Sequence, residues 1–430
     1  MVMTESPPRA RERLTAGLRH TPGRLALWMT VLVALALLTG LAAVTGIRQR
    51  AAHIDTLATR HGPLTIAALD LYRALSDADA TAASAFLTGG LEPPALRDRY
   101  LADVAEAGRA LTVLGAGLTG ADDAGAAHLA VIGARLPVYT GLIETARSLN
   151  RQGLPVGAAY LREANGLMRA ELLPAARGAY DDAARDLRAS RDGGGAVPWP
   201  ATLLCLLTVG ALIVVQRRLT RLTRRVLNPG LLVATGAAGL LTLWLVVSAA
   251  VSGAHLTAGG DDGSDRMELL ADIRIAALRA RTDEALTLVA RGSGGAFEQH
   301  WTETMESITR DGGALDSARR PATGADAPHL TRAGEAADRW VTAHRDLRAD
   351  DDGGDHAGAV TVALGDAATY SAALDAALGA AIAADGDVFA AEARRAGTAL
   401  RLADLGAGAL TVLMIVGSVI GVQRRRAEYR

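Results

Sequence analysis

The sequence contains no lysine, and its basic residues other than histidine are all arginines. A P-loop places a lysine on the phosphates, a protein kinase needs a strand lysine, and a Schiff-base enzyme needs the amine as nucleophile. The only cysteine is Cys205, so the chain cannot form an intrachain disulfide framework or a multi-cysteine zinc site. The absence of lysine therefore excludes these three lysine-dependent sites, and the single cysteine excludes the disulfide framework and the zinc site.

Two short motifs superficially suggest chemistry. Residues 115–120 spell GxGxxG, but an apolar helical repeat precedes them where a dinucleotide site requires a strand. Residues 350–356 (DDDGGDH) lack the alternating ligands and late glutamate of a calcium loop, so we interpret them as a solvated loop with at most a weak cation site. No HExxH, GxSxG or clustered His/Cys pattern occurs. We expect no catalytic, cofactor-binding or metal-ligating residues and no cofactor, and hence no enzyme.

Four apolar segments dominate what the sequence does contain: residues 25–47, 197–216, 231–251 and 405–423. Each is about as long as a helix that crosses a bilayer. The second and fourth both end in Val-Gln and are followed by Arg-Arg. None holds an acidic residue, which argues against an ion or proton transporter. The sequence therefore predicts four transmembrane helices arranged as one hairpin repeated twice.

Arginine clusters predict the orientation of these helices. They lie in residues 1–24, 217–230 and 424–430, which we assign to a cytoplasmic N-terminus, a basic cytoplasmic loop and a cytoplasmic tail. The protein is then a multi-pass protein of the cell membrane, with residues 48–196 and 252–404 outside the cytoplasm. The first segment could instead be a cleaved signal peptide, but its apolar run is longer than a signal-peptide core.

The two external regions predict helical bundles. They are rich in alanine and poor in β-branched runs, and apolar residues recur every seven positions, as in Leu57, Leu64, Leu71 and in Leu129, Leu136, Ile143. Pro63 and Pro174 are expected to kink helices rather than end them. Arg73 aligns with Arg274, and Thr81 with Thr282, at a spacing of 201 residues. We predict an all-α membrane protein with four transmembrane helices and two extracytoplasmic four-helix-bundle domains in tandem duplication.

The basic cytoplasmic loop is the one candidate contact site in the sequence. Positive-inside topology and contact with anionic lipid heads account for its charge, and docking of a cytoplasmic protein is the alternative. Its arginines are Arg217, Arg218, Arg221, Arg224 and Arg225. The near-neutral formal net charge of the whole chain, -1, argues against a nucleic-acid partner.

The layout resembles known signalling families. A membrane hairpin that encloses an external helical bundle resembles the sensory half of bacterial chemoreceptors, although no HAMP module or methylation helices follow it. Four spans, two external helical domains, an internal duplication and an arginine-, alanine- and glycine-rich composition typical of actinobacteria are similar to GlnX. That resemblance implies a link between a GlnH-like solute-binding lipoprotein outside and the Ser/Thr protein kinase G inside. It rests on architecture and transfers no site residue.

The sequence thus predicts a non-enzymatic transmembrane sensor that relays the status of an external solute, such as an amino acid, to a cytoplasmic partner such as a Ser/Thr kinase. We expect it to be a homo-oligomer. The alternative is a structural or scaffold membrane protein of the cell envelope, which would bind its partners constitutively rather than in response to a ligand.

Overall fold

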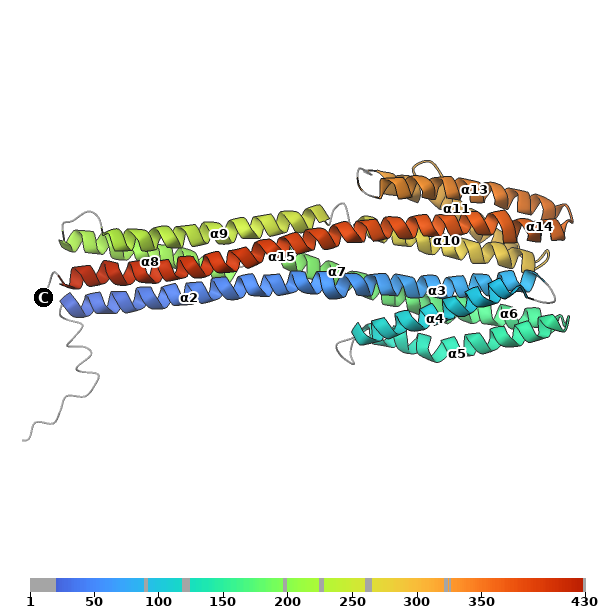
Figure 1. Cartoon of the computed structure of the whole chain (residues 1–430), viewed down its shortest axis with the longest axis horizontal. Helices are drawn as coiled ribbons and strands as arrows, with labels where there is room; N and C mark the ends of the chain where they lie inside the picture. Colours follow the sequence, from blue (N-terminus) through green and yellow to red (C-terminus); the bar gives the residue numbers. More distant parts are fainter. Residues whose placement is uncertain are drawn as a thin grey trace, which may run out of the picture. The chain divides into compact units, whose positions relative to one another are not determined.

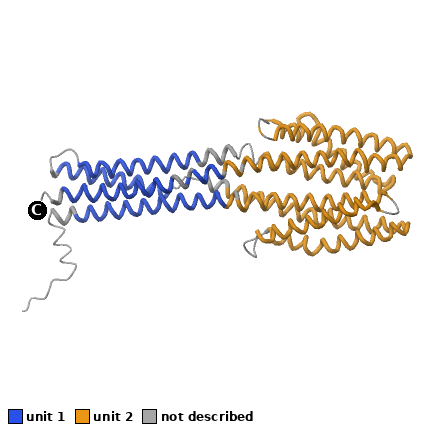
Figure 2. The backbone as a smooth tube through the Cα atoms, viewed as in Figure 1, with its two compact units in different colours: residues 1–55, 192–256, 393–430 blue, residues 56–191, 257–392 orange. Residues whose placement is uncertain are grey.

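A computed structural model describes residues 21–88, 92–117, 124–195, 199–223, 228–259, 265–320, 324 and 326–427. Within this described part no residue lies in a β-strand, and the elements are α-helices with short π-helical segments (Figure 1). The chain divides into two compact units (Figure 2). Unit 1 takes residues 1–55, 192–256 and 393–430, and unit 2 takes residues 56–191 and 257–392. The all-helical class predicted from composition is confirmed.

Unit 1 contains the four apolar segments. They lie in α2 (Thr21–Thr56), α8 (Trp199–Thr223), α9 (Pro229–Gly259) and the last part of α15 (Ala368–Ala427). Large apolar side chains remain exposed on all four, with Leu41 63%, Leu207 61%, Leu243 60% and Val412 60% exposed. A water-soluble surface rarely carries so much exposed apolar side chain, whereas lipid tails accommodate it. Unit 1 is therefore compatible with a membrane protein.

Small and polar residues hold the helices of unit 1 close together. Thr39 and Thr208 share a buried hydrogen bond of 2.7 Å between α2 and α8. A Cβ added to Gly230 on α9 would lie 2.5 Å from the backbone nitrogen of Gly421 on α15, so the two backbones touch. Asn228 also donates to the Gly421 carbonyl at 2.7 Å. Packing of small residues and interhelical hydrogen bonds is how helices associate in lipid.

The helices extend beyond the predicted spans. α8 continues past residue 216 to Thr223, so Arg217, Arg218 and Arg221 are helical rather than part of a loop. α15 likewise includes residues 424–427 of the predicted tail. The predicted N-terminal arginines in residues 1–20, together with Arg224, Arg225 and residues 428–430, lie outside the described residues.

The first half of unit 2 has four helical segments. They are α3 (Gly62–Leu87), α4 (Pro94–Gly117), α5 (Ala124–Arg151) and a last run made of α6 (Val156–Leu167), η2 (Met168–Leu172) and α7 (Leu173–Gly195). The predicted heptad positions Leu71 and Ile143 are buried in the core.

π-Helical segments accompany two prolines in this half. η1 (Leu57–His61) ends just before Gly62 and Pro63, and η2 ends two residues before Pro174. A proline inside a helix lacks the N–H for the hydrogen bond to residue i−4, and a π-helical turn is one way for the backbone to adjust. The helical assignment continues through both prolines, as the sequence predicted.

The second half of unit 2 repeats the order of segments. It has α10 (Asp265–Val289), α11 (Gly295–Thr309), α12 (Ala314–Arg319) and α13 (Ala327–Asp352), then α14 (His356–Val362), η4 (Ala363–Ala367) and the first part of α15. Gly312, with φ +72°, separates α11 from α12, because this left-handed conformation does not continue a helix.

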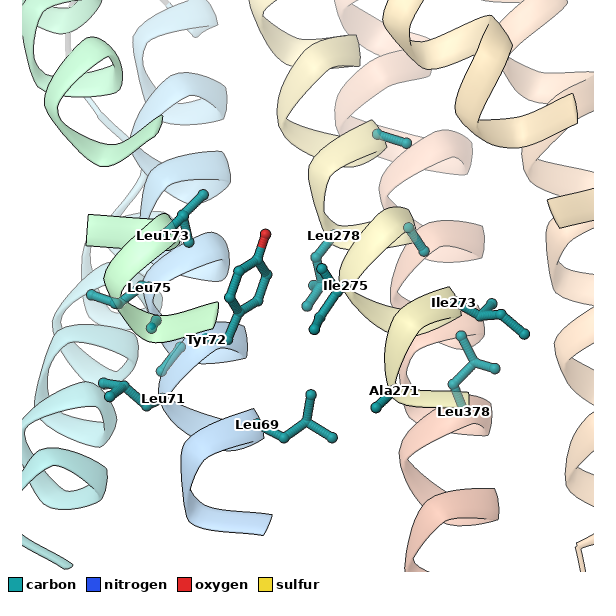
Figure 3. Packing of buried hydrophobic residues seen from close by; sticks show 14 of the residues in the cluster. Leu69, Leu71, Tyr72, Leu75, Leu173, Ala271, Ile273, Ile275, Leu278 and Leu378 are labelled. Atoms are coloured by element: carbon teal, nitrogen blue, oxygen red, sulfur yellow. The ribbon is translucent and has the colours of Figure 1, made fainter. Parts of the chain in front are cut away.

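The two halves share one core in unit 2. Figure 3 shows Leu69 and Tyr72 of α3 facing Ile275 and Leu278 of α10, and all four are buried. Polar contacts cross the same interface. Arg281 pairs with Asp77 at 2.6 Å, and Arg279 donates to the hydroxyl of Tyr72 at 2.6 Å. The predicted external regions, residues 48–196 and 252–404, therefore both contribute to one compact unit.

Among the described residues, five helical stretches are long and apolar enough to cross a membrane. Four overlap the predicted spans, and two of these are very long: the helical assignment is unbroken from Ala26 to Leu87 and from His356 to Arg424. The fifth is Gly125–Arg151 in α5. It contributes Ile132 and Tyr139 to the core of unit 2, so packing inside this unit accounts for part of its apolar character.

Candidate functional site

Corresponding positions in the two halves of unit 2 stand 201 residues apart. The spacing seen at Arg73 and Arg274 extends through the helices and the turns between them. Gly153 and Gly354, both in the left-handed region at φ +68° and +90°, follow α5 and α13 respectively. The further matched pairs are Tyr100 and Trp301, Tyr139 and Trp340, Arg147 and Arg348, and Gly157 and Gly358.

Each half has a polar cavity at these turns. The first is about 340 Å³ and lies where α3 ends, α4 begins and α5 meets α6. Its lining includes three guanidinium groups and two carboxylates, those of Arg97, Arg147, Arg151, Glu92 and Glu144. Its charged lining is net positive, which favours an anionic group on a ligand.

Arg147 is the central group of the first cavity. Its side chain is 10% exposed, and it pairs with Glu92 at 3.0 Å and with Glu144 at 2.9 Å. The guanidinium lies over the ring of Tyr100, 4.2 Å from the centroid, which holds it by a cation–π contact. Arg97 pairs with the other oxygen of Glu144 at 3.0 Å. Glu144 thus joins two arginines, and at 47% exposed it is open to solvent.

The second cavity is about 500 Å³ and has the opposite charge balance. Its lining includes Arg291 and Arg348 together with Glu298, Asp351, Asp352 and His356. Arg348 is fully engaged: it contacts Glu298 at 3.5 Å and Asp351 at 2.8 Å and also bonds to Asp352. The same backbone frame therefore presents a net positive cavity in one half and an arginine neutralised by acids in the other.

A buried carboxyl group lies in each half and is bonded by the matched aromatic residue. Asp79 on α3 accepts from the Tyr139 hydroxyl at 3.1 Å and from Asn165 at 2.6 Å. Burial raises the pKa of Asp79 to about 6, and the hydrogen bonds from Asn165 and Tyr139 only partly offset this effect. Glu284 on α10 accepts from the indole N–H of Trp340 at 3.1 Å.

His344 extends the polar network of the second half. Its Nδ1 lies 2.8 Å from Glu284 and its Nε2 lies 3.1 Å from Glu298, while its ring stacks on Trp301 with centroids 3.3 Å apart. Burial lowers the pKa of His344, but the hydrogen bonds that its ring makes to the carboxylates of Glu284 and Glu298 outweigh this effect and raise the pKa overall. The corresponding position in the first half is Ile143, so the first half has no such network at this position.

The residues singled out from sequence lie elsewhere. Arg217, Arg218 and Arg221 are exposed in the last turns of α8, where arginines also interact favourably with the helix dipole. They line neither cavity. Residues 350–356 do reach the second cavity, but no group of three His, Cys, Asp or Glu residues in the described chain is placed to hold a metal ion.

Sequence reasoning missed Tyr100 and Arg147, and it missed the network around His344. Each lies in a helix with no short motif around it. The spacing of 201 residues was the available signal, because it pairs Tyr100 with Trp301 and Arg147 with Arg348. Because the chain has few aromatic residues, a large aromatic or an arginine at the same position in both halves indicates a candidate site residue.

Comparison with known protein families finds one match, over part of the chain. Residues 53–192 match the family model of the Actinobacterial sensor domain, and this range holds the first half of unit 2 and its cavity. The match supports an actinobacterial sensor protein and suggests a sensing or signalling role. No curated protein and no solved structure matches the chain.

Proposed function

We propose that this protein is a non-enzymatic transmembrane sensor that relays the status of an extracytoplasmic solute to a cytoplasmic partner. The observation that carries the proposal is the sensor-domain match over the half that holds the net positive cavity. Ala82, Ala85 and Phe86 of that cavity belong to the unbroken helical stretch Ala26–Leu87, which also contains the first apolar segment. A ligand that alters the end of α3 thus acts on a helix that continues into the predicted membrane span.

The cavity fits a small solute that carries a carboxylate. Arg97 and Arg151 offer guanidinium groups to an anion, and Glu92 is a partner for an ammonium group, so an amino acid matches both signs. A carboxylate on the surface of a GlnH-like lipoprotein would meet the same groups. The bound state must favour one helix arrangement over the other, because a ligand with equal affinity for both transmits nothing.

We propose that the cytoplasmic arginines pass the signal to the cytoplasmic partner by binding it. In a GlnX-type relay the partner is a Ser/Thr protein kinase, with Arg217, Arg218, Arg221, Arg224 and Arg225 as its contact. The four apolar segments then span the membrane with both termini in the cytoplasm. The two halves of unit 2 are the products of a tandem duplication, each derived from a four-helix bundle, as the constant spacing of matched residues supports.

The test is crosslinking in cells, followed by purification of the tagged full-length protein and mass spectrometry. Wild type is compared with a variant carrying all five arginines changed to glutamine, after its topology has been checked by reporter fusions. We expect wild type to capture a solute-binding lipoprotein and a kinase, and the variant to lose the kinase alone. Recovery of only cell-envelope assembly proteins would overturn the relay and favour the scaffold.

A second pair of variants tests the cavity. Arg147→Gln should reduce capture of the lipoprotein, or abolish the thermal stabilisation of purified protein by glutamate or aspartate. Arg348→Gln, its matched control in the other half, should leave both unchanged. Equal effects of the two substitutions would contradict the assignment of the ligand site to the first half.

A further inference from the structure

A buried polar layer lies one helical turn from the first cavity. It is formed by Asp79 on α3, Tyr139 on α5 and Asn165 on α6, and the Asp79 carboxyl group accepts hydrogen bonds from the other two. Buried apolar residues of the cavity lining stand three or four positions away on the same three helices, where side chains are neighbours on one face. They are Ala82, Ile143 and Leu161. One turn of apolar side chains therefore separates the cavity from this layer.

The carboxyl group of Asp79 is bonded by neutral donors. Its Oδ1 accepts from the Tyr139 hydroxyl at 3.1 Å and its Oδ2 accepts from the Asn165 amide at 2.6 Å, and it forms no ion pair with any residue that the structure describes. Arg169 on η2 acts on it electrostatically, but this guanidinium is bonded to Asp283 on α10. A buried carboxylate with no cation in contact is costly, so the protonated form is favoured.

The titratable and charged groups that face Asp79 come from four elements. They are Tyr100 on α4, Tyr139 on α5, Arg169 on η2 and Asp283 on α10. Burial raises the pKa of both tyrosines, so their hydroxyls stay neutral between pH 5 and pH 8. Arg169 and Asp283 form an ion pair with each other. The pKa of Asp79, raised by burial to about 6, falls inside this range, so its charge changes there.

The second half compensates its buried carboxylate with a histidine instead. Nδ1 of His344 lies 2.8 Å from the carboxylate of Glu284, and the pKa of His344 is raised by its hydrogen bonds to glutamates. The first half has Ile143 at the position of His344 and therefore offers no cation there. A proton is what remains to neutralise Asp79.

We propose that the first cavity takes up an anionic ligand together with a proton, and that Asp79 holds the proton. The inference rests on the ligand site in the proposed function. Two turns of α5, about 12 Å, separate Arg147 from Tyr139, the partner of Asp79. At this distance and an effective dielectric constant of about 20, repulsion between a carboxylate on Arg147 and ionised Asp79 changes the binding constant about tenfold. Glu144 moves into water as the ligand arrives, where salt screens its charge.

The coupling makes the affinity depend on pH. Because linkage is reciprocal, the protein with protonated Asp79 binds the anion more tightly than the protein with ionised Asp79. The affinity should therefore fall about tenfold as the pH rises from 5 to 8. In the proposed orientation unit 2 lies outside the cytoplasm, so the sensor responds to external acidity together with the solute.

Calorimetry of glutamate binding to the full-length protein in nanodiscs measures the proton, when buffers of different ionisation enthalpy are compared. Wild type should take up about half a proton per glutamate at pH 6.5. Asp79→Asn should take up none, and its affinity should not depend on pH. The matched control is Asp385→Asn, because the pKa of Asp385 is also raised to about 6 but this residue faces Asp326 and Arg266 in the second half. The control should behave as wild type. Proton uptake that is absent from wild type, or that survives in Asp79→Asn, would overturn the proposal.

A second measurement needs no ligand. Arg147→Gln removes a positive charge from the cavity, which acts on Asp79 in the same sense as an arriving carboxylate. The difference in melting temperature between Asp79→Asn and its parent chain, measured against pH, should shift its midpoint upward by about one pH unit in the Arg147→Gln background. An unchanged midpoint would overturn the coupling even if glutamate binds. A shifted midpoint without glutamate binding would support the coupling of Asp79 to the cavity and refute glutamate as the ligand in the proposed function.

Discussion

Replacing Asp79 by asparagine should remove a pH-dependent loss of stability from unit 2. Asp79 is 2% exposed, and its burial raises the pKa to about 6 from 3.8. Because the folded pKa lies above the unfolded one, the neutral carboxyl group costs nothing below pH 4. As the pH rises through the folded pKa, the wild type loses about 3 kcal/mol, at about 1.4 kcal/mol per pH unit.

Asparagine keeps the hydrogen bonds but cannot ionise. Its oxygen accepts from Asn165, and its amide can donate to the Tyr139 oxygen, the two partners that Asp79 now has. Any fixed cost of the substitution is the same at every pH. The free energy of unfolding of the variant, relative to wild type, should therefore rise by about 3 kcal/mol between pH 4 and pH 7.

Thermal unfolding of the full-length protein in nanodiscs, followed by tryptophan fluorescence, measures this difference. The buried residues Trp301 and Trp340 both lie in unit 2 and report on it. The difference in melting temperature between variant and wild type should change by on the order of 5 °C across this pH range. Asp338→Asn, at an exposed position on α13, serves as the control. A difference for Asp79→Asn that stays constant with pH would refute the reasoning.

Three further substitutions test other parts of the structure. His344→Gln should destabilise unit 2 by about 3 kcal/mol at pH 6 and by less at pH 9. The pKa of His344 is raised, so the stabilisation of its protonated ring by Glu284 and Glu298 is lost as the pH rises. A difference in melting temperature that does not change with pH would contradict this. Gly230→Leu should lower the melting temperature of unit 1, since its Cβ would meet backbone atoms of α15, whereas Gly236→Leu, with open space, should not. Glu144→Gln removes the charge that competes with a ligand carboxylate for Arg97 and Arg147, so it should tighten the binding of glutamate to purified protein, measured by calorimetry. Weaker binding would contradict the assignment of the ligand site to this cavity.

The helices and their limits were predictable because they depend on local signals. Alanine-rich sequence with heptad spacing of apolar residues predicts α3 and α5, and the apolar segments predict the helices of unit 1. The extension of α8 to Thr223 was missed because charge marks topology but does not end a helix.

The cavities were not predictable in the same way. The position of Arg147 in the cavity depends on its contacts with Tyr100 of α4 and with Glu92, which precedes α4. No local sequence pattern links these three residues. The association of the two halves into one unit depends on Tyr72 and its contacts with α10, which are distant in sequence. Side-chain contacts between separate helices require the tertiary structure.

The differences between the halves indicate where a ligand can act. Glu144 is 47% exposed, so an incoming carboxylate can replace it on Arg97 and Arg147 while Glu144 returns to water at little cost. In the second half, Glu284 and His344 are buried, and separating them would leave an uncompensated charge inside the core. Exchange of ion-pair partners therefore costs a ligand less binding free energy in the first half than in the second. The first half is therefore the more favourable place for the ligand of the proposed relay, which must bind one helix arrangement better than the other.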